Sequence, residues 1–169
     1  MEEQAKKKFI TRSMTFDDLP SIMAIENVIF ADPWKEEMFY YEIEMKESYV
    51  LEDVSNNRIV AYLCGVAILD EYMITNIAVE QDKQSRGYAS YLISSVLDKE
   101  FKSGCKNCYL EVRISNNKAI RLYEKLGFET MGIRKAYYSN PVEDAYLMKC
   151  NLLDNYDKIA MYKKESAIK

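Results

Sequence analysis

The amino-acid sequence predicts one domain of the α+β class, in which a mixed, mostly antiparallel β-sheet is flanked by helices. About seven apolar segments of strand length and about four segments with apolar residues at helical spacing predict these elements. Three strands follow one another with short turns between them, which predicts an antiparallel meander. A helix then separates two further strands, which predicts a right-handed parallel crossover in a sheet covered on both faces.

Apolar periodicity and turn residues place the individual elements. Thr15 fits the N-cap of the first helix, and Asp32 and Pro33 fit the N-cap and first turn of the second. Gly104 and Gly127 fit the positions that end the last two helices. The strands are expected at residues 9–12, 49–54, 59–69, 72–79, 108–113, 128–138 and 144–152, and the helices at residues 15–29, 32–46, 90–102 and 117–126.

The sequence contains no repeat or linker that would indicate a second domain. Residues 9–152 are expected to form the single domain, preceded by a disordered tail at residues 1–8. Residues 153–169 form a polar tail in which Tyr156, Ile159 and Tyr162 recur at a spacing of three. One interpretation of this tail is a loosely docked helix.

The absence of histidine and the net charge of −4 exclude several classes of function. Neither a Ser-His-Asp nor a Cys-His arrangement can form, so a general base must be another side chain or a terminal amine. The negative charge argues against a general nucleic-acid-binding protein, which usually presents a basic face. A basic partner, such as a cationic peptide, is compatible with this charge.

The four cysteines are expected to be reduced thiols in or near the core. Cys105 and Cys108 form one C-x-x-C pair, but no second pair completes a zinc site, so no metal is expected. No apolar run is long enough to span a membrane. The N-terminal residues lack the apolar segment of a signal peptide. The sequence therefore predicts a cytoplasmic protein that does not enter a membrane.

The segment from Val79 to Ile93 predicts an anion-binding turn. A strand precedes it, a helix follows it, and Gly87 lies where the loop meets the helix. The first turn of a helix has backbone N–H groups without intrahelical partners, and the helix dipole adds positive charge there. Because Gly87 lacks a Cβ, an anion can approach the backbone closely. We therefore expect a pyrophosphate at this turn.

Four segments in chain order resemble the GNAT superfamily of N-acetyltransferases. The loop pattern Q/R-x-x-G-x-G/A alone is weakly specific, whereas the ordered set is specific and the resemblance covers residues 9–152. The resemblance implies the GNAT fold, in which a parallel pair of strands is splayed at the acetyl-CoA site. The four segments are Asn76–Val79, Gln84–Ala89, Leu110–Asn116 and Ala119–Phe128. Further residues narrow the resemblance to N-terminal alanine acetyltransferases of ribosomal proteins, namely Phe30–Trp34, Tyr137, Tyr138 and Glu143–Ala145.

The resemblance also implies acetyl-CoA as the co-substrate, with no metal. The loop amides would hold the pyrophosphate, and the strand at residues 77–79 would pair with the pantetheine arm. Arg86 is either a phosphate ligand or a solvated side chain, and Asn116 is a cofactor contact, a helix N-cap or both. The family's cofactor-binding positions fall on Ile77, Ala78, Val79, Ser85, Arg86, Gly87, Tyr88, Ala89, Ser90 and Asn116.

Glu111 and Tyr123 are the catalytic candidates. A peptide α-amine has a pKa of about 8 and must lose a proton before it attacks a thioester. In a chain without histidine, Glu111 near the end of a central strand is the natural base. Tyr123 can donate a proton to the CoA thiolate in a direct transfer without an acyl-enzyme. The alternative interpretations are an exposed strand glutamate and a core tyrosine.

Trp34, Tyr137 and Tyr138 are expected to bind the acceptor peptide, although each also fits a packing role. The resemblance implies that the acceptor is the N-terminus of a small-subunit ribosomal protein. We expect a monomer that does not bind nucleic acid directly. Two alternatives stay open: a GNAT enzyme that acetylates another protein N-terminus, a lysine, a polyamine or a small molecule, and a non-catalytic acyl-CoA-binding module.

Overall fold

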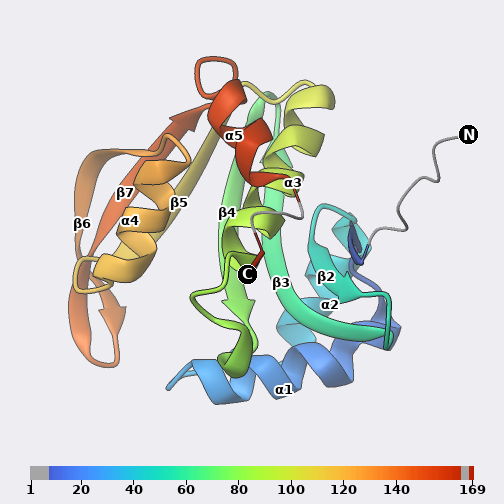
Figure 1. Ribbon diagram of the computed structural model, residues 1–169. Helices are drawn as coiled ribbons and strands as arrows, with labels where there is room; N and C mark the ends of the chain where they lie inside the picture. The colour runs from blue at the N-terminus through green and yellow to red at the C-terminus, as the bar shows by residue number, and fades with distance from the viewer. Residues whose placement is uncertain (1–7, 165–167) are drawn as a thin grey trace, which may run out of the picture.

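The computed structural model describes residues 8–164 and 168–169. Its centre is a seven-stranded sheet in the order β1-β2-β3-β4-β5-β7-β6 (Figure 1). The expected α+β class and element order are confirmed, and residues 1–7 of the expected N-terminal tail lie outside the described residues. The strands are β1 (Phe9–Ser13), β2 (Tyr49–Asp53), β3 (Arg58–Ile68), β4 (Glu71–Val79), β5 (Asn107–Arg113), β6 (Glu129–Ser139) and β7 (Val142–Asn151), and the helices are α1 (Leu19–Ile29), α2 (Glu36–Met45), α3 (Tyr88–Lys102), α4 (Asn117–Lys125) and α5 (Tyr156–Tyr162).

Strands β4 and β5 are the parallel pair, and the other neighbouring strands are antiparallel. Helix α3 connects the two parallel strands, as the sequence predicts for a strand–helix–strand crossover. Strands β2, β3 and β4 form the expected meander. The sheet is therefore mostly antiparallel, with its one parallel contact in the middle.

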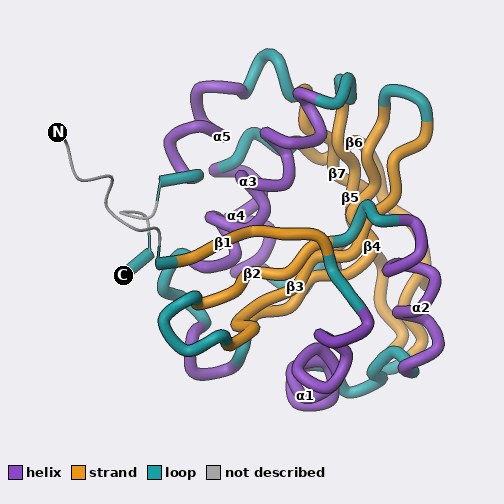
Figure 2. The backbone as a smooth tube through the Cα atoms, turned by 90° about the vertical axis from the view of Figure 1, so that its right-hand side faces the viewer, coloured by secondary structure: helices purple, strands orange, loops and turns teal. Residues whose placement is uncertain are grey.

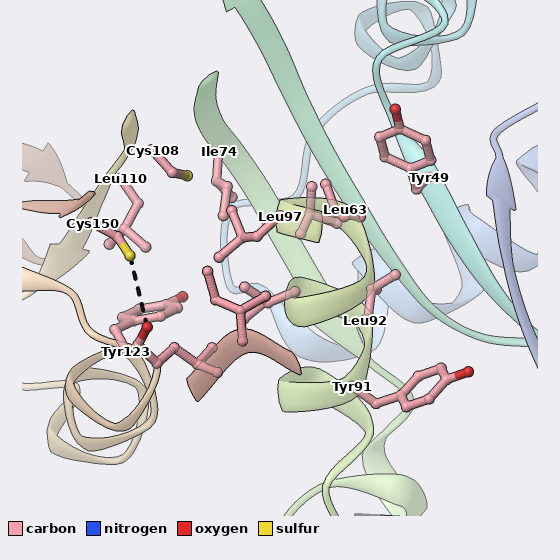
Figure 3. Packing of buried hydrophobic residues seen from close by; sticks show 14 of the residues in the cluster. Tyr49, Leu63, Ile74, Tyr91, Leu92, Leu97, Cys108, Leu110, Tyr123 and Cys150 are labelled. Carbon is pink, nitrogen blue, oxygen red and sulfur yellow. Dashed lines mark hydrogen bonds between the residues drawn. The ribbon is translucent and has the colours of Figure 1, made fainter. Parts of the chain in front are cut away.

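Helices cover both faces of the sheet and bury two separate apolar clusters. Helices α1 and α2 pack on one face, and α3, α4 and α5 pack on the other (Figure 2). Figure 3 shows Leu92 and Leu97 of α3 packed toward Leu63 and Ile74 of the sheet. Side chains of successive strand residues alternate between the two clusters, because a strand points them to opposite faces.

The predicted start of the second helix is wrong. Helix α2 begins at Glu36 with Lys35 as its N-cap, so Asp32 and Pro33 lie in the loop before it. The backbone N–H of Trp34 donates to Glu26 of α1 at 2.7 Å, and this contact holds the loop outside the helix. A tertiary hydrogen bond thus overrides the local capping signal of an aspartate followed by a proline.

The C-terminal tail contains helix α5, at Tyr156–Tyr162. It packs on α3 through Asp98, whose carboxylate accepts the Tyr156 hydroxyl at 2.9 Å and pairs with Lys102 at 2.8 Å and with Lys163. Burial opposes ionisation of Asp98, but the hydrogen bonds from these three donors outweigh it and lower its pKa to about 2. The Asp98 carboxylate therefore connects α5 to the core.

Replacing Asp98 with asparagine is expected to lower the free energy of unfolding at neutral pH by up to about 2 kcal/mol. A folded-state pKa of about 2 lies below the unfolded value, so the stabilisation is present above about pH 4 and disappears as the pH falls toward 2. Urea melts of both proteins across this range measure the difference. Asp157→Asn on the exposed side of α5 is the matched control. An equal loss of stability in Asp157→Asn would contradict the role given to Asp98. So would a stability difference between wild type and Asp98→Asn that does not narrow in acid.

Candidate functional site

The parallel strands β4 and β5 pair only over Glu71–Ile74 and Asn107–Leu110. Strand β4 carries an extra residue at Thr75, where its register against β3 shifts, and such a bulge bends a strand away from its neighbour. Beyond the bulge, β4 stays paired with β3 as far as Val79, while β5 stays paired with β7 as far as Arg113. Figure 1 shows the two strands running apart. The expected splay of the parallel pair is confirmed.

Beyond the bulge, the edge of β4 that faces β5 has no strand paired with it among the described residues. Ile77 and Val79 pack toward α3, and Ala78 packs toward α1. Because the backbone groups of a strand point sideways, these three residues can pack with their side chains and pair with an extended ligand through their backbone. The edge therefore suits a molecule that carries amide groups.

The loop between β4 and α3 has the geometry of an anion site. Ser85 and Gly87 are left-handed, with φ of 62° and 93°, and Gly87 is the N-cap of the 15-residue helix α3. Left-handed residues in a turn aim neighbouring N–H groups at one concave surface. The unpaired N–H groups of the first helical turn, at residues 88–90, add the positive end of the helix dipole. This surface lies directly after the open edge of β4.

Side chains of the loop contribute less than its backbone. Tyr88 is buried with its ring edge against Phe9, at 5.3 Å between ring centroids, so its expected role rests on the backbone N–H. Arg86 has an exposed side chain, and its carbonyl accepts the backbone N–H of Lys169 at 2.8 Å. Ala89 and Ser90 are half-buried at the start of α3. Direct contact between Arg86 and a phosphate stays a prediction.

Glu111 lies on β5 one residue beyond Leu110, where the pairing with β4 ends. Leu110 faces the cluster under α3 and α4, so the alternating side chain of Glu111 faces the opposite side of the sheet. Arg134 approaches the Glu111 carboxylate with its Nε at 3.1 Å, and the Tyr137 hydroxyl donates to it at 3.3 Å. Both partners come from β6, so the β6–β7 hairpin orients the candidate base.

A bulge in β6 brings Arg134 and Tyr137 together. Residues 135–137 lie opposite the single residue Asp144 of β7, and Ala136 is left-handed with φ of 48°. The Asp144 carboxylate accepts the Ala136 N–H at 2.8 Å and so holds the bulge. Sequence reasoning missed Arg134, because regular alternation places residues three apart on opposite faces. Position 136 is an alanine, so no glycine or other turn residue there indicates the bulge in the sequence.

Tyr137 and Tyr138 remain protonated near neutral pH. Burial, together with the nearby charge of Glu111, raises the pKa of Tyr137. Burial also raises the pKa of Tyr138 to about 12, and the Arg113 guanidinium stacks over its ring at 4.1 Å from the centroid. The two tyrosines are therefore available as hydrogen-bond donors beside Glu111.

Tyr123 projects from α4 and is only 7 % exposed. Its ring packs against Phe128 with 5.8 Å between centroids, and Figure 3 shows it beside Leu110 and Cys150. Its hydroxyl forms no hydrogen bond within residues 8–164 and 168–169. Burial raises its pKa, so the phenol keeps its proton near neutral pH. Core packing is confirmed, and a role as proton donor stays a prediction.

The two catalytic candidates thus lie on opposite faces of the sheet. Tyr123 belongs to the cluster covered by α3 and α4, whereas Glu111 faces the side of α1 and α2. The splay between β4 and β5 opens the sheet next to Glu111. A group held in the splay can meet a base from one face and a proton donor from the other.

Trp34 and Asn116 occupy loops on either side of this arrangement. Trp34 is half-buried in the α1–α2 loop, with its ring 5.4 Å from that of Phe39. The Asn116 side chain accepts the Ala119 N–H at 3.1 Å and caps α4. The N-cap interpretation of Asn116 is confirmed, and a contact with a cofactor stays a prediction.

Other features give no second candidate centre. The four cysteines are free and buried. Among the described residues, no three Cys, Asp or Glu side chains lie together in a group suited to a metal ion. Over the same part of the chain, no helix is long and apolar enough to cross a bilayer. A cavity of about 580 Å³ lies between α1 and the residues after β4, and no candidate site residue lines it.

Comparisons with known proteins agree with this geometry. Residues 19–128 match the model of the Acetyltransferase (GNAT) family. The [ribosomal protein bS18]-alanine N-acetyltransferase of Salmonella typhimurium is 38 % identical over 134 residues, which cover 78 % of this chain and 89 % of the relative. The enzyme of the same name from Escherichia coli K12 is 37 % identical over 139 residues, which cover 80 % and 93 %.

A solved structure supports the same relationship. The crystal structure of the ribosomal-protein-S18-alanine N-acetyltransferase from Escherichia coli aligns with a TM-score of 0.78 and 35 % identity, over 85 % of this chain and 93 % of that chain. The family match covers more than half of the residues, and it includes both the splayed strands and the turn before α3. The chain therefore belongs to the GNAT family of acetyltransferases.

Proposed function

We propose that the protein is an N-terminal acetyltransferase that transfers the acetyl group of acetyl-CoA to the N-terminal alanine of a ribosomal protein. The observation that carries the proposal is the splay of β4 and β5, with the anion-binding turn at one end and Glu111 beside it. Relatives that are named for this acceptor match most of the chain at 37–38 % identity. We also propose that the protein acts as a cytoplasmic monomer.

The residues present fit acetyl-CoA by their chemistry. The backbone N–H groups of Arg86 to Ser90 suit the two negative phosphates of a pyrophosphate. The open backbone groups at residues 77–79 suit the amides of a pantetheine arm. An arm that runs from the turn along β4 directs the thioester toward the splay, where Asn116 of the next loop is a further candidate contact.

The chain's own residues account for the proton transfers. Glu111 takes the proton from the α-ammonium group of the acceptor, whose pKa of about 8 keeps it mostly charged at neutral pH. The free amine then forms a bond to the thioester carbonyl carbon, and the carbon–sulfur bond breaks. Tyr123 gives its proton to the departing sulfur, and the second proton, which the nitrogen loses as the amide forms, returns through solvent to the tyrosinate. Backbone N–H groups of β4 between Ile77 and Val79 are available to stabilise the carbonyl oxygen during the attack.

The proposed acceptor site lies on the face of Glu111. Tyr137 and Tyr138 flank this carboxylate, and Trp34 lies in the loop beside β4. Exposed glutamates on α2, at Glu36 and Glu37, favour a basic peptide by long-range attraction. The sequence prediction that Trp34, Tyr137 and Tyr138 bind the acceptor is kept here as part of the proposal.

The proposal is tested by mass spectrometry of peptides incubated with the purified protein and acetyl-CoA. A peptide with the N-terminal sequence of the bS18 protein should gain one acetyl group on its α-amine. The same peptide with a blocked N-terminus and an internal lysine should gain none. Acetylation of lysine, spermidine or free amino acids in preference to the Ala-starting peptide would refute the acceptor, and no release of thiol with any amine would refute the enzyme assignment.

Gly87→Ala is expected to weaken acetyl-CoA binding about tenfold, since a left-handed conformation costs a residue with a Cβ about 1–2 kcal/mol. The φ of 93° at the N-cap of α3 favours glycine. Gly104→Ala is the matched control, because Gly104 has φ of 110° at the other end of α3 and open space around it. Isothermal titration with acetyl-CoA should show weaker binding for the first variant only, and equal affinities would contradict the proposed turn.

A further inference from the structure

Glu26 is a buried carboxylate that the proposed mechanism does not use. It lies on α1, is only 1 % exposed, and accepts hydrogen bonds from three different parts of the fold. The backbone N–H of Trp34 donates at 2.7 Å, the Asn76 side-chain amide of β4 donates at 3.2 Å, and the Tyr62 hydroxyl of β3 also donates. A buried polar group is costly without hydrogen-bond partners, and because all three donors share this one carboxyl group, their contacts are coupled to one another.

The contacts of Glu26 connect two regions that the acetyl transfer requires. Asn76 is the residue after the β4 bulge at Thr75, and Ile77 follows it on the open edge. Trp34 lies in the irregular segment between α1 and α2, at residues 30–35. One carboxylate therefore fixes the α1–α2 loop relative to the strand edge at which the thioester is proposed to lie.

Only a few other contacts hold this loop. The Phe30 N–H closes α1 by donating to the Glu26 carbonyl at 3.0 Å, and the Trp34 ring packs on Phe39. Within the described residues, the backbone of residues 31–34 makes one hydrogen bond to a side chain of another element. In this bond the Trp34 N–H donates to the Glu26 carboxylate. Loss of this bond frees the loop without removing any side chain from it.

We propose that Glu26 is a positioning residue that sets the place of the acceptor relative to the thioester by holding the α1–α2 loop against β4. The proposal rests on the proposed N-terminal acetyltransferase function. A displacement of about 1 Å between reacting groups is enough to lower a rate strongly. Because Glu26 contacts β4 through the Asn76 side chain and not through the backbone edge at residues 77–79, we expect its loss to act on the acceptor and to leave acetyl-CoA binding intact.

A second buried carboxylate provides the matched control. Glu42 on α2 is 8 % exposed and accepts the Ser48 hydroxyl at 2.6 Å, but it makes no hydrogen bond to residues 30–35. Burial raises the pKa of the Glu42 carboxyl group. Replacing Glu42 with glutamine therefore removes a buried titratable group, as replacing Glu26 does. Glu26→Gln and Glu42→Gln therefore make the same chemical change on the same face of the sheet, and only the first acts on the loop.

The experiment uses the fluorescence of Trp34 to report on the α1–α2 loop, since Trp34 is the single tryptophan of the sequence. Glu26→Gln should shift its fluorescence emission to the red and make it easier to quench with acrylamide, whereas Glu42→Gln should leave both as in the wild type. With the Ala-starting peptide, Glu26→Gln should raise the peptide KM about tenfold and leave the Kd of acetyl-CoA within about twofold. Glu26→Asp keeps the carboxyl group but shortens the side chain. Its Trp34 fluorescence and its peptide KM should lie between those of the wild type and those of Glu26→Gln.

Unchanged Trp34 fluorescence and peptide KM in folded Glu26→Gln would overturn the proposal, and so would equal effects of Glu42→Gln. If Glu26→Gln does not fold, Glu26→Asp decides by the same two measurements. Absence of acetylation by the wild type would instead refute the proposed function. In that case the fluorescence comparison, which needs no activity, still decides whether Glu26 holds the loop.

Discussion

Glu111→Gln is expected to lower kcat for an Ala-starting peptide by about 10²- to 10⁴-fold at neutral pH, the usual contribution of a general base. Glutamine keeps the size of the side chain and can still accept the hydrogen bond from Tyr137, but it loses the ion pair with Arg134 and cannot take a proton. Above about pH 8 the loss should shrink, because the acceptor amine is then neutral without assistance. Steady-state kinetics from about pH 6 to about pH 10 would measure both effects.

Glu71→Gln is the matched control for this experiment. Glu71 is also a strand glutamate, on β4 of the parallel pair, and it accepts the Tyr109 hydroxyl at 3.1 Å much as Glu111 accepts that of Tyr137. It lies at the paired end of β4, away from the splay. Its replacement should leave kcat within about twofold. Equal losses in the two variants, or a Glu111→Gln enzyme with wild-type kcat at every pH, would contradict the role of Glu111.

Tyr123→Phe is expected to lower kcat about 10²-fold at all accessible pH values, because it removes the proton donor for the leaving sulfur. The raised pKa of Tyr123 keeps its phenol protonated well above neutral pH, so the wild type should show no loss of activity from its ionisation there. Stability should change by less than about 0.5 kcal/mol, since the ring against Phe128 is retained. Kinetics and thermal unfolding of the same preparations measure both quantities.

Tyr72→Phe should give the opposite result and serves as the control. The Tyr72 hydroxyl donates to the Glu47 carbonyl at 2.6 Å in the core, so its loss should cost about 1 kcal/mol of stability and leave kcat unchanged. If Tyr123→Phe instead lost stability and kept kcat, Tyr123 would be a core residue alone. A loss of kcat with an intact fold would support its role as the acid.

Much of the fold could be predicted from local patterns. The spacing of apolar residues predicts the strand and helix segments, and the helix between β4 and β5 predicts the parallel crossover. The anion site followed in the same way, because Gly87 lies where a strand leads through a loop into a helix. These features depend on residues that are close in sequence, so the sequence alone contains enough information for them.

Helix α2 shows where local patterns fail. Its apolar residues form two neighbouring stripes, and the sequence pattern makes Met38, Tyr41, Ile43 and Met45 available for burial. Of these four, only Ile43 is buried, and the other three are exposed. The fold buries Phe39, Ile43 and, unexpectedly, Glu42. Periodicity cannot choose between two such stripes, since the choice depends on which sheet residues lie below the helix.

The candidate site divides in the same way. The sequence by itself determined the element order, the turn at Gly87, and the presence of Glu111 on a central strand in a chain without histidine. Only the tertiary structure decided that Arg134 and Tyr137 meet Glu111 and that Glu26 ties Trp34 to β4. Those contacts join residues 8 to 50 positions apart. The contacts of Arg134, Tyr137 and Asn76 also depend on two strand bulges without a local sequence signal, because a bulge changes which residues of a strand share a face.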